Sequence, residues 1–192
     1  MPSKDNYILT GLTSGLKSRS DGNPKEVTGV MQETGLTGEH IVASAIVRRF
    51  MKEFPDRESR KKGLEIINNF LKANGFDSLR IVNDEYDERC VLNSLWYTKE
   101  GSKPFDIITL SEGKIRLIEV KSTRGNNLLH FSKRESILAN KYRENYEVMV
   151  CDISKDRIYR IGNPLPEKPE YSNSYIKIRP RGYDVELLKL SK

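Results

Sequence analysis

The spacing of apolar residues predicts two amphipathic helices in the first half of the chain. Residues 38–53 are expected to form a helix capped by Thr37, because apolar side chains recur at intervals of three and four. Its apolar stripe consists of Ile41, Val42, Ala45, Ile46 and Phe50. Residues 57–73 carry a second helical pattern, and Asn74 and Gly75 are expected to end it.

The segment before these helices has a different character. Residues 1–37 are rich in Gly, Ser, Thr, Lys and Asn and contain few large apolar side chains. Such a composition is typical of a flexible or loosely packed arm. We therefore expect an N-terminal arm over residues 1–37 and one domain over residues 38–192.

After residue 75 the period changes from helical to extended. A helix is expected again at residues 131–142. The order of helices, strands, helix and strands predicts an α/β fold with a mixed central β-sheet flanked by helices. The expected strands are residues 79–82, 91–97, 105–110, 114–122, 146–153 and 157–161, with late strands at 175–178 and 185–190, of which the second alternatively forms a helix.

The strands at 105–110 and 114–122 are expected to form a hairpin. A two-residue turn at Glu112 and Gly113 is the simplest connection, because glycine supplies the positive φ that such turns need. In this register Ile108 lies opposite Leu117, and Asp106 lies opposite Glu119. Lys121, two residues beyond Glu119, projects from the same face of the sheet.

The hairpin thereby places two carboxylates side by side at the end of an apolar strand pair. Like charges in this position destabilise a sheet, and burial adds to their repulsion. A hard divalent cation such as Mg²⁺ between Asp106 and Glu119 would remove the conflict. Lys121 could then orient an attacking water and stabilise charge on a phosphate. Alternatively, Glu119 and Lys121 form a plain ion pair, and Asp106 accepts backbone hydrogen bonds at a strand start.

The same residues resemble a known family. Pro104-Phe105-Asp106, followed after twelve residues by Glu119-Val120-Lys121, resembles the motif of the PD-(D/E)XK nuclease superfamily, although Phe105 separates the proline from the acid. The flanking text, with Phe131-Ser132, Glu135 and Tyr146-Glu147-Val148, is similar to the branch that contains the NO VEIN C-terminal domain. The resemblance covers residues 38–153. This branch also contains domains attached to restriction systems and helicases.

This resemblance implies a restriction-endonuclease-like αβββαβ core and a metal-dependent endonuclease that hydrolyses phosphodiester bonds in DNA. It implies that Asp106, Glu119 and the main-chain carbonyl of Val120 bind Mg²⁺, for which Mn²⁺ could substitute, and that Lys121 serves the nucleophilic water. Glu39 resembles the helix-borne catalytic glutamate of many such nucleases, or it is an acid favoured in a first helical turn. The alternatives are a catalytically inactive nucleic-acid-binding module of the same fold and an RNA-directed nuclease.

Further polar residues surround the motif in the sequence. Glu135 could contact the metal-binding side chains without binding the metal itself, although Ser132 and Glu135 also fit a capping box. The candidates for contact with nucleic-acid phosphates are Ser122, Thr123, Arg124, Lys133 and Arg134. The three basic members could equally be solvated surface residues, and Ser122 and Thr123 could simply end the strand.

Composition narrows the functional classes. Charged residues make up 31% of the 192 residues, the net charge is +6, and no apolar run approaches a membrane span. Two cysteines and two distant histidines predict neither a disulfide framework nor a zinc site. A basic protein suits DNA as partner. We expect a cytoplasmic or nuclear protein that is not secreted, compatible with a homodimer or a larger restriction, repair or helicase-linked system.

Overall fold

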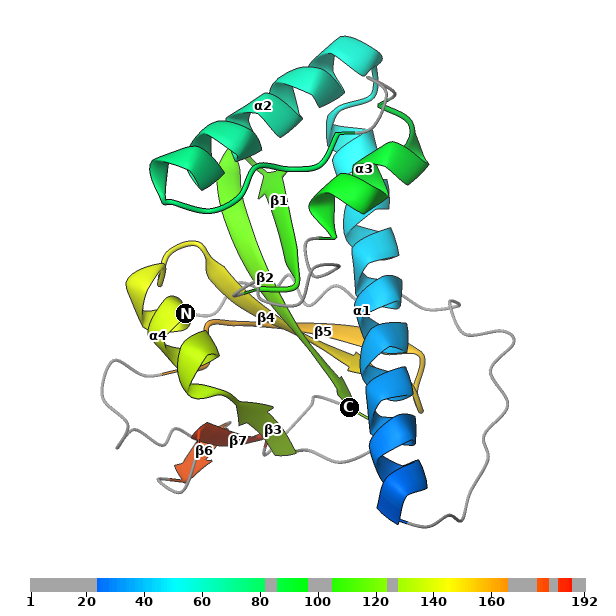
Figure 1. Ribbon diagram of the computed structural model, residues 1–192, viewed down its shortest axis with the longest axis vertical. Helices are drawn as coiled ribbons and strands as arrows, with labels where there is room; N and C mark the ends of the chain where they lie inside the picture. The colour runs from blue at the N-terminus through cyan, green and yellow to red at the C-terminus, as the bar shows by residue number, and fades with distance from the viewer. Residues whose placement is uncertain are drawn as a thin grey trace.

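A mixed four-stranded sheet lies at the centre of the protein (Figure 1). The computed structural model describes residues 24–81, 86–96, 105–123, 128–165, 176–179 and 183–187. The sheet has the order β1-β2-β4-β5, in which β2 and β4 are parallel and the outer pairs are antiparallel. Its strands are β1 (Ile107–Ser111), β2 (Lys114–Thr123), β4 (Tyr146–Asp152) and β5 (Arg157–Gly162).

Helices cover both faces of this sheet. Gly38 of α1 approaches Ser122 of β2, whereas Glu135 of α4 contacts Lys121. Because neighbouring residues of a strand point to opposite faces, α1 and α4 lie on opposite sides of β2. The α/β fold with a mixed sheet flanked by helices is thereby confirmed. The helices are α1 (Pro24–Glu53), α2 (Arg57–Ala73), α3 (Glu88–Leu95) and α4 (Lys133–Lys141).

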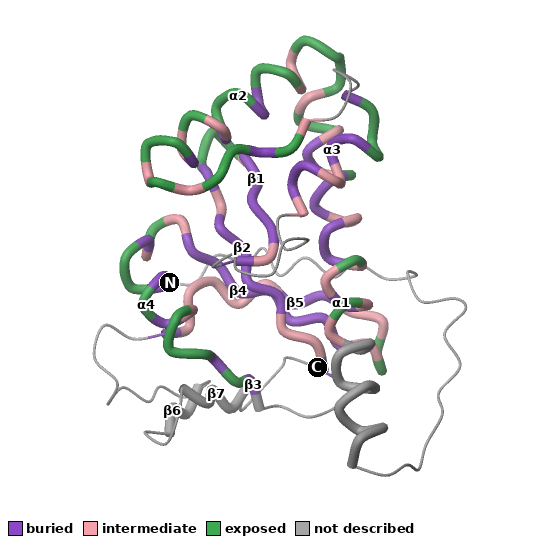
Figure 2. Tube along the Cα trace, viewed as in Figure 1, coloured by how far each residue is buried: buried purple, intermediate pink, exposed green. Residues whose placement is uncertain are grey.

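The core lies between these layers, and β4 is buried along its whole length (Figure 2). Val42, Phe50 and Leu64 are among the fully buried side chains that α1 and α2 contribute. A second sheet of order β3-β7-β6 consists of β3 (Leu128–Phe131), β6 (Ile176–Arg179) and β7 (Tyr183–Leu187). No helix in the described part of the chain is both long enough and apolar enough to cross a membrane.

The hairpin of β1 and β2 has the register that the sequence predicts. Ile108 pairs with Leu117 and Leu110 with Ile115. Glu112 and Gly113 form the turn with φ values of 55° and 70°. Both values are positive, as a two-residue turn that matches the strand twist requires. The expected helix at 57–73, the capped helix after Ser132 and the hairpin of β4 and β5 are also confirmed.

The first helix begins earlier than expected. It starts at Pro24, so Gly38 lies inside α1 and the expected cap at Thr37 is wrong. Residues 1–23 of the expected arm lie outside the described residues, and the division into an arm and a domain at residue 37 stays a prediction. Gly38 allows α1 to approach the sheet closely, because a Cβ there would overlap Ser122 Oγ and lie 2.8 Å from Ser122 Cβ.

The two strands expected before β1 are wrong. Residues 79–81 have no regular structure, Val82 lies outside the described residues, and residues 91–95 belong to α3. Asp87 caps α3 by accepting a hydrogen bond from the Cys90 amide, 2.7 Å away. This cap decides in favour of a helix, because the apolar residues of this segment fit either period.

Along the chain, the elements from α3 to β4 follow the expected αβββαβ order as α3, β1, β2, β3, α4 and β4. The element that precedes β1 is a helix, and Trp96 at its end makes an isolated antiparallel bridge to Ile107. The third strand of this order, β3, pairs with β7 in the second sheet and not with the central sheet. Of the three strands between α3 and α4, β1 and β2 belong to the central sheet and β3 belongs to the second sheet.

The contact at Gly38 gives a test of the helix–sheet packing. Gly38→Ala should lower the free energy of unfolding by roughly 1–3 kcal/mol, because the added methyl group overpacks the contact with β2. Gly35→Ala is the matched control in the same helix, since its added Cβ has no described atom within 4 Å apart from its chain neighbours and the backbone of its own helix. The control should instead raise stability by roughly 0.5–1 kcal/mol. Equal effects of both variants in denaturant titrations would contradict the close approach.

Candidate functional site

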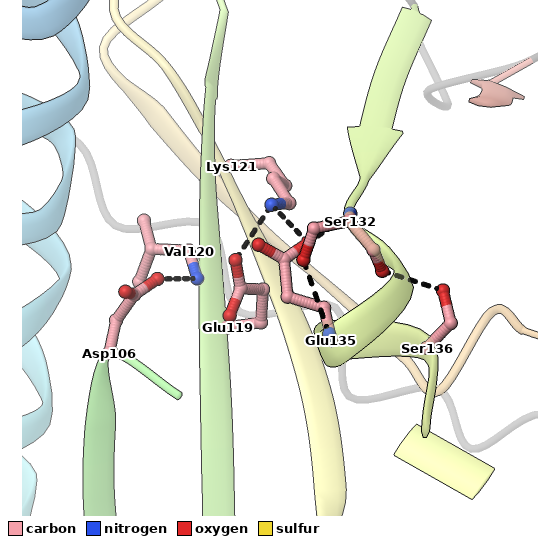
Figure 3. Close-up of polar contacts among 7 residues, drawn as sticks. All are labelled: Asp106, Glu119, Val120, Lys121, Ser132, Glu135 and Ser136. Carbon is pink, nitrogen blue, oxygen red and sulfur yellow. Dashed lines mark hydrogen bonds and ion pairs between the residues drawn. The ribbon is translucent and has the colours of Figure 1, made fainter. Parts of the chain in front are cut away.

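Asp106 lies where the hairpin ladder ends. The last ladder pair is Ile107 with Ile118, and the Asp106 amide donates to the Ile118 carbonyl at 3.0 Å. Its side chain turns to β2, where Asp106 Oδ2 accepts the Val120 amide hydrogen at 2.7 Å (Figure 3). The Val120 amide is therefore paired with a side-chain carboxylate and not with a main-chain carbonyl of β1. The expectation that Asp106 and Glu119 form a pair of the hairpin ladder is corrected, because the ladder ends at Ile107 and Ile118.

This contact also orients the Val120 carbonyl. In a β-strand the N–H and C=O groups of one residue point to the same edge. Since the Val120 N–H points to Asp106, its carbonyl faces the same side, beyond the start of β1. Asp106 and the main chain of Val120 thus share one edge of β2.

Glu119 and Lys121 project together from the face of β2 that α4 covers. Lys121 Nζ donates to Glu119 Oε1 at 2.7 Å and to Glu135 Oε2 at 2.9 Å (Figure 3). The Phe131 ring lies 5.1 Å from the same nitrogen. Glu119 is 5% exposed, so this is an ion-paired cluster in the protein interior.

Glu135 has two roles at once. Its Oε2 accepts the Ser132 amide hydrogen at 2.9 Å, and Ser132 Oγ accepts the Glu135 amide hydrogen at 3.2 Å. This reciprocal pair is the predicted capping box of α4. The same Oε2 accepts from Lys121, so the start of α4 is tied to the C-terminal part of β2.

Glu39 reaches the site from α1. Trp96 Nε1 donates to Glu39 Oε2 at 3.4 Å, which ties the carboxylate to the end of α3. The charge of Glu39 acts on Asp106 strongly enough to raise the pKa of the Asp106 carboxyl. The close approach of Gly38 to Ser122 places Glu39 in this position.

Burial and neighbouring charges shift the pKa values of the cluster in both directions. Burial and the neighbouring Glu39 raise the pKa of Asp106 from 3.8 to about 7. Burial and the neighbouring Asp106 raise the pKa of Glu119 well above its ordinary value. For Glu135, burial is outweighed by Lys121, and the pKa is lowered. For Lys121, burial is outweighed by Glu119 and Glu135, and the pKa is raised, so this lysine remains an ammonium ion.

The donor set fits a hard divalent cation. Two carboxylates and a main-chain carbonyl are oxygen ligands of the kind that Mg²⁺ and Mn²⁺ prefer. The raised pKa values of Asp106 and Glu119 indicate that this position favours added positive charge. Among the described residues no three His, Cys, Asp or Glu side chains gather as metal ligands. The expected set differs from such a group, since Val120 would contribute its main chain.

The expected phosphate contacts divide into two groups. Lys133 and Arg134 are exposed in the first turn of α4, close in the chain to Glu135. Thr123 is buried, and Ser122 Oγ is a buried atom that faces Gly38. Neither of these two hydroxyl residues is therefore placed to meet a phosphate. Arg124 lies outside the described residues.

Tyr146 lies near the cluster although it is not among the site residues that the sequence predicts. Tyr146 begins β4 beside Leu117 of β2, and it is 3% exposed. Burial raises the pKa of its phenol, and the charges of Glu119, Glu135 and Asp106 raise it further. The proximity of Tyr146 to the acids follows from the parallel register of β2 and β4, which a local sequence pattern does not predict.

Comparison with known families supplies the affiliation of the chain. Residues 64–161 match the family described as Protein NO VEIN, C-terminal, and this segment is half of the chain. The chain belongs to this family. The NO VEIN C-terminal segment runs from α2 to β5 and includes Asp106, Glu119 and Lys121, whereas Glu39 precedes it. No curated protein and no solved structure matches the chain.

The raised pKa of Asp106 predicts a pH-dependent stability. Because this pKa is about 7 in the folded protein and 3.8 ordinarily, the carboxyl favours folding at low pH, and this contribution is lost as pH rises through 7. Asp106→Asn keeps an oxygen acceptor for the Val120 amide and removes the titration. Its melting temperature should exceed that of the wild type by the order of a few degrees at pH 8.

The pH profile is the decisive measurement. In thermal unfolding with a chelator, the difference between Asp106→Asn and wild type should widen from pH 4 to pH 7 and then level off. A difference that is the same at every pH would contradict the raised pKa of this carboxyl.

Proposed function

We propose that the protein is a divalent-cation-dependent endonuclease that hydrolyses phosphodiester bonds in DNA. The observation that carries this proposal is the crowding of buried acids around one lysine at the position of the nuclease-like motif. Asp106, Glu119 and Glu135 gather there with Lys121, and the pKa values of Asp106 and Glu119 are raised. Such pKa shifts are concentrated at functional sites.

Other buried acids of the protein are handled differently. Glu147 is paired with Arg160 and lies 4.0 Å from Arg116, and Asp152 pairs with Lys155 at 3.2 Å. Each of these acids has a basic partner of its own. The motif acids share one ammonium, which is the arrangement expected where a cation from solution completes the charge balance.

In the proposed site Asp106, Glu119 and the Val120 carbonyl would hold Mg²⁺, with Mn²⁺ able to substitute. The ion would supply Lewis acidity toward a phosphate oxygen and the attacking water. Asp106 is held in position by the Val120 amide, and Glu119 by Lys121. These contacts preorganise the two acids before any ligand arrives.

Lys121 would act as a fixed positive charge. Because its pKa is raised, the ammonium ion can donate hydrogen bonds to the water or to a phosphate oxygen, but it does not serve as a base in this state. Glu135 holds the ammonium toward α4, and Glu39 approaches Asp106 from the other side. Glu39 would thus act on the metal ligand Asp106 through its charge, and Glu135 would orient Lys121.

The choice of DNA as substrate depends on charge. The chain carries a net charge of +6, and exposed Lys133 and Arg134 follow the capping residue Ser132 at the edge of the cluster. Basic side chains at a helix start are suited to phosphate oxygens. A homodimer would serve cleavage of both strands, and that arrangement belongs to the proposal.

Cleavage of supercoiled plasmid in Mg²⁺ tests the assignment. Asp106→Ala and Lys121→Ala should each reduce the cleavage rate by about 100-fold or more, because each removes a group that stabilises the transition state. Lys114→Ala is the matched control, since Lys114 is an exposed lysine on the same strand. The control should cleave at the wild-type rate, and equal rates for all four proteins would show that the activity comes from elsewhere.

A second candidate is a nucleic-acid-binding module without cleavage activity. One observation favours it: Lys121 already pairs with Glu119 and Glu135 at 2.7 and 2.9 Å, so two of the acids have a cationic partner without a metal ion. This candidate predicts salt-sensitive binding of DNA and no rise in melting temperature on addition of Mg²⁺. Matched RNA and DNA substrates in the cleavage assay separate the DNA assignment from an RNA-directed enzyme.

A further inference from the structure

Tyr146 carries a buried hydroxyl group that lacks a hydrogen-bond partner among the described residues. A phenol in this state has lost its hydrogen bonds to water and gained none in return. Such burial is unfavourable by an amount comparable to a lost hydrogen bond. An orphaned hydroxyl in the interior therefore calls for an explanation.

The strand register places this group on the acidic face. Tyr146 pairs with Leu117 in the parallel ladder of β2 and β4, and paired residues of parallel strands point to the same face. Glu119 lies two residues beyond Leu117 and therefore projects from that face as well. The electrostatic influence of Glu119 on the phenol is larger than that of Glu135 or Asp106.

The neighbouring charges also fix what the phenol can do. Because its pKa is raised, Tyr146 keeps its proton at neutral pH and can act as a hydrogen-bond donor. Glu119 is an acceptor, and its Oε1 is engaged by Lys121. A carboxylate that binds a cation is ordinarily held by further hydrogen bonds, and such partners contribute strongly to affinity.

We propose that Tyr146 is a positioning residue whose hydroxyl donates a hydrogen bond to the Glu119 carboxylate when a divalent cation is bound. The inference depends on the proposed function, since it assigns Tyr146 to the same cation site. With Asp106, Glu119 and the Val120 carbonyl as ligands, the Tyr146 hydroxyl would hold the Glu119 carboxylate in its orientation together with Lys121.

Tyr142 offers a matched control. Its hydroxyl is also buried without a hydrogen-bond partner among the described residues, and it lies at the end of α4. Its ring packs against Phe70 and Phe76, with centroids 6.1 and 5.6 Å away. The substitution of either tyrosine by phenylalanine thus removes the same atom from a similar environment, but only Tyr146 faces the acids.

The test measures Mn²⁺ binding by calorimetry and the melting temperature with a chelator. Tyr146→Phe should bind Mn²⁺ about 10- to 100-fold more weakly than the wild type. Without metal, its melting temperature should equal or exceed that of the wild type, because the variant no longer buries an unpaired hydroxyl. Tyr142→Phe should show the same behaviour without metal and wild-type affinity for Mn²⁺.

The outcomes separate this inference from the proposed function. Wild-type Mn²⁺ affinity in Tyr146→Phe, with binding lost in Asp106→Asn, would overturn the role of Tyr146 and leave the cation site standing. Equal loss of affinity in both phenylalanine variants would also overturn it, because the effect would then be one of packing. If the wild type itself bound no Mn²⁺, the proposed function would fail together with the inference.

Discussion

The burial of several carboxylates beside a single ammonium is the constraint on which the arrangement of the site depends. Glu119 is nearly inaccessible to water, and its charge interacts with Asp106 on one side and with Lys121 on the other. A buried carboxylate is more simply stabilised by a basic partner of its own, as the pairing of Glu147 with Arg160 shows in the same sheet. The cluster therefore stores electrostatic repulsion that a cation can relieve.

The fold holds this cluster together from separate parts of the chain. The hairpin of β1 and β2 supplies Asp106 and Glu119, α4 supplies Glu135, and α1 supplies Glu39. Each of these elements is held in place by a different local feature of the chain. The turn at Gly113 fixes the hairpin, and the small residue at 38 lets α1 approach β2 closely.

Much of this arrangement could be predicted because its signals are local. The Glu112-Gly113 turn and the alternation of apolar residues predict the register of the hairpin. The capping box of Ser132 and Glu135 predicts the start of α4. The segment at 91–95 was misjudged, because a short apolar segment fits both a helix and a strand, and its cap at Asp87 was not recognised. The start of α1 differs from the prediction because Thr37, a residue type that favours helix caps, lies inside a helix that begins at Pro24.

The rest depends on partners that are distant in sequence. The β3 strand is four residues long and pairs with β7, more than fifty residues away, so no local pattern identifies it. Tyr146 is placed on the same face of the sheet as Glu119 only through the parallel register of β2 with β4. The turn of the Asp106 carboxylate toward the Val120 amide likewise follows from where the ladder ends, which periodicity alone does not give.

The double engagement of Glu135 Oε2 has a consequence for the local folding of α4. This one oxygen closes the first turn of the helix and also anchors the ammonium of Lys121. Any ligand that draws Lys121 away leaves the oxygen entirely to the helix start, and the opening of that turn becomes less frequent. The backbone amides of the first turn would thereby exchange their hydrogens with solvent more slowly, and they would report occupancy of the site from outside it.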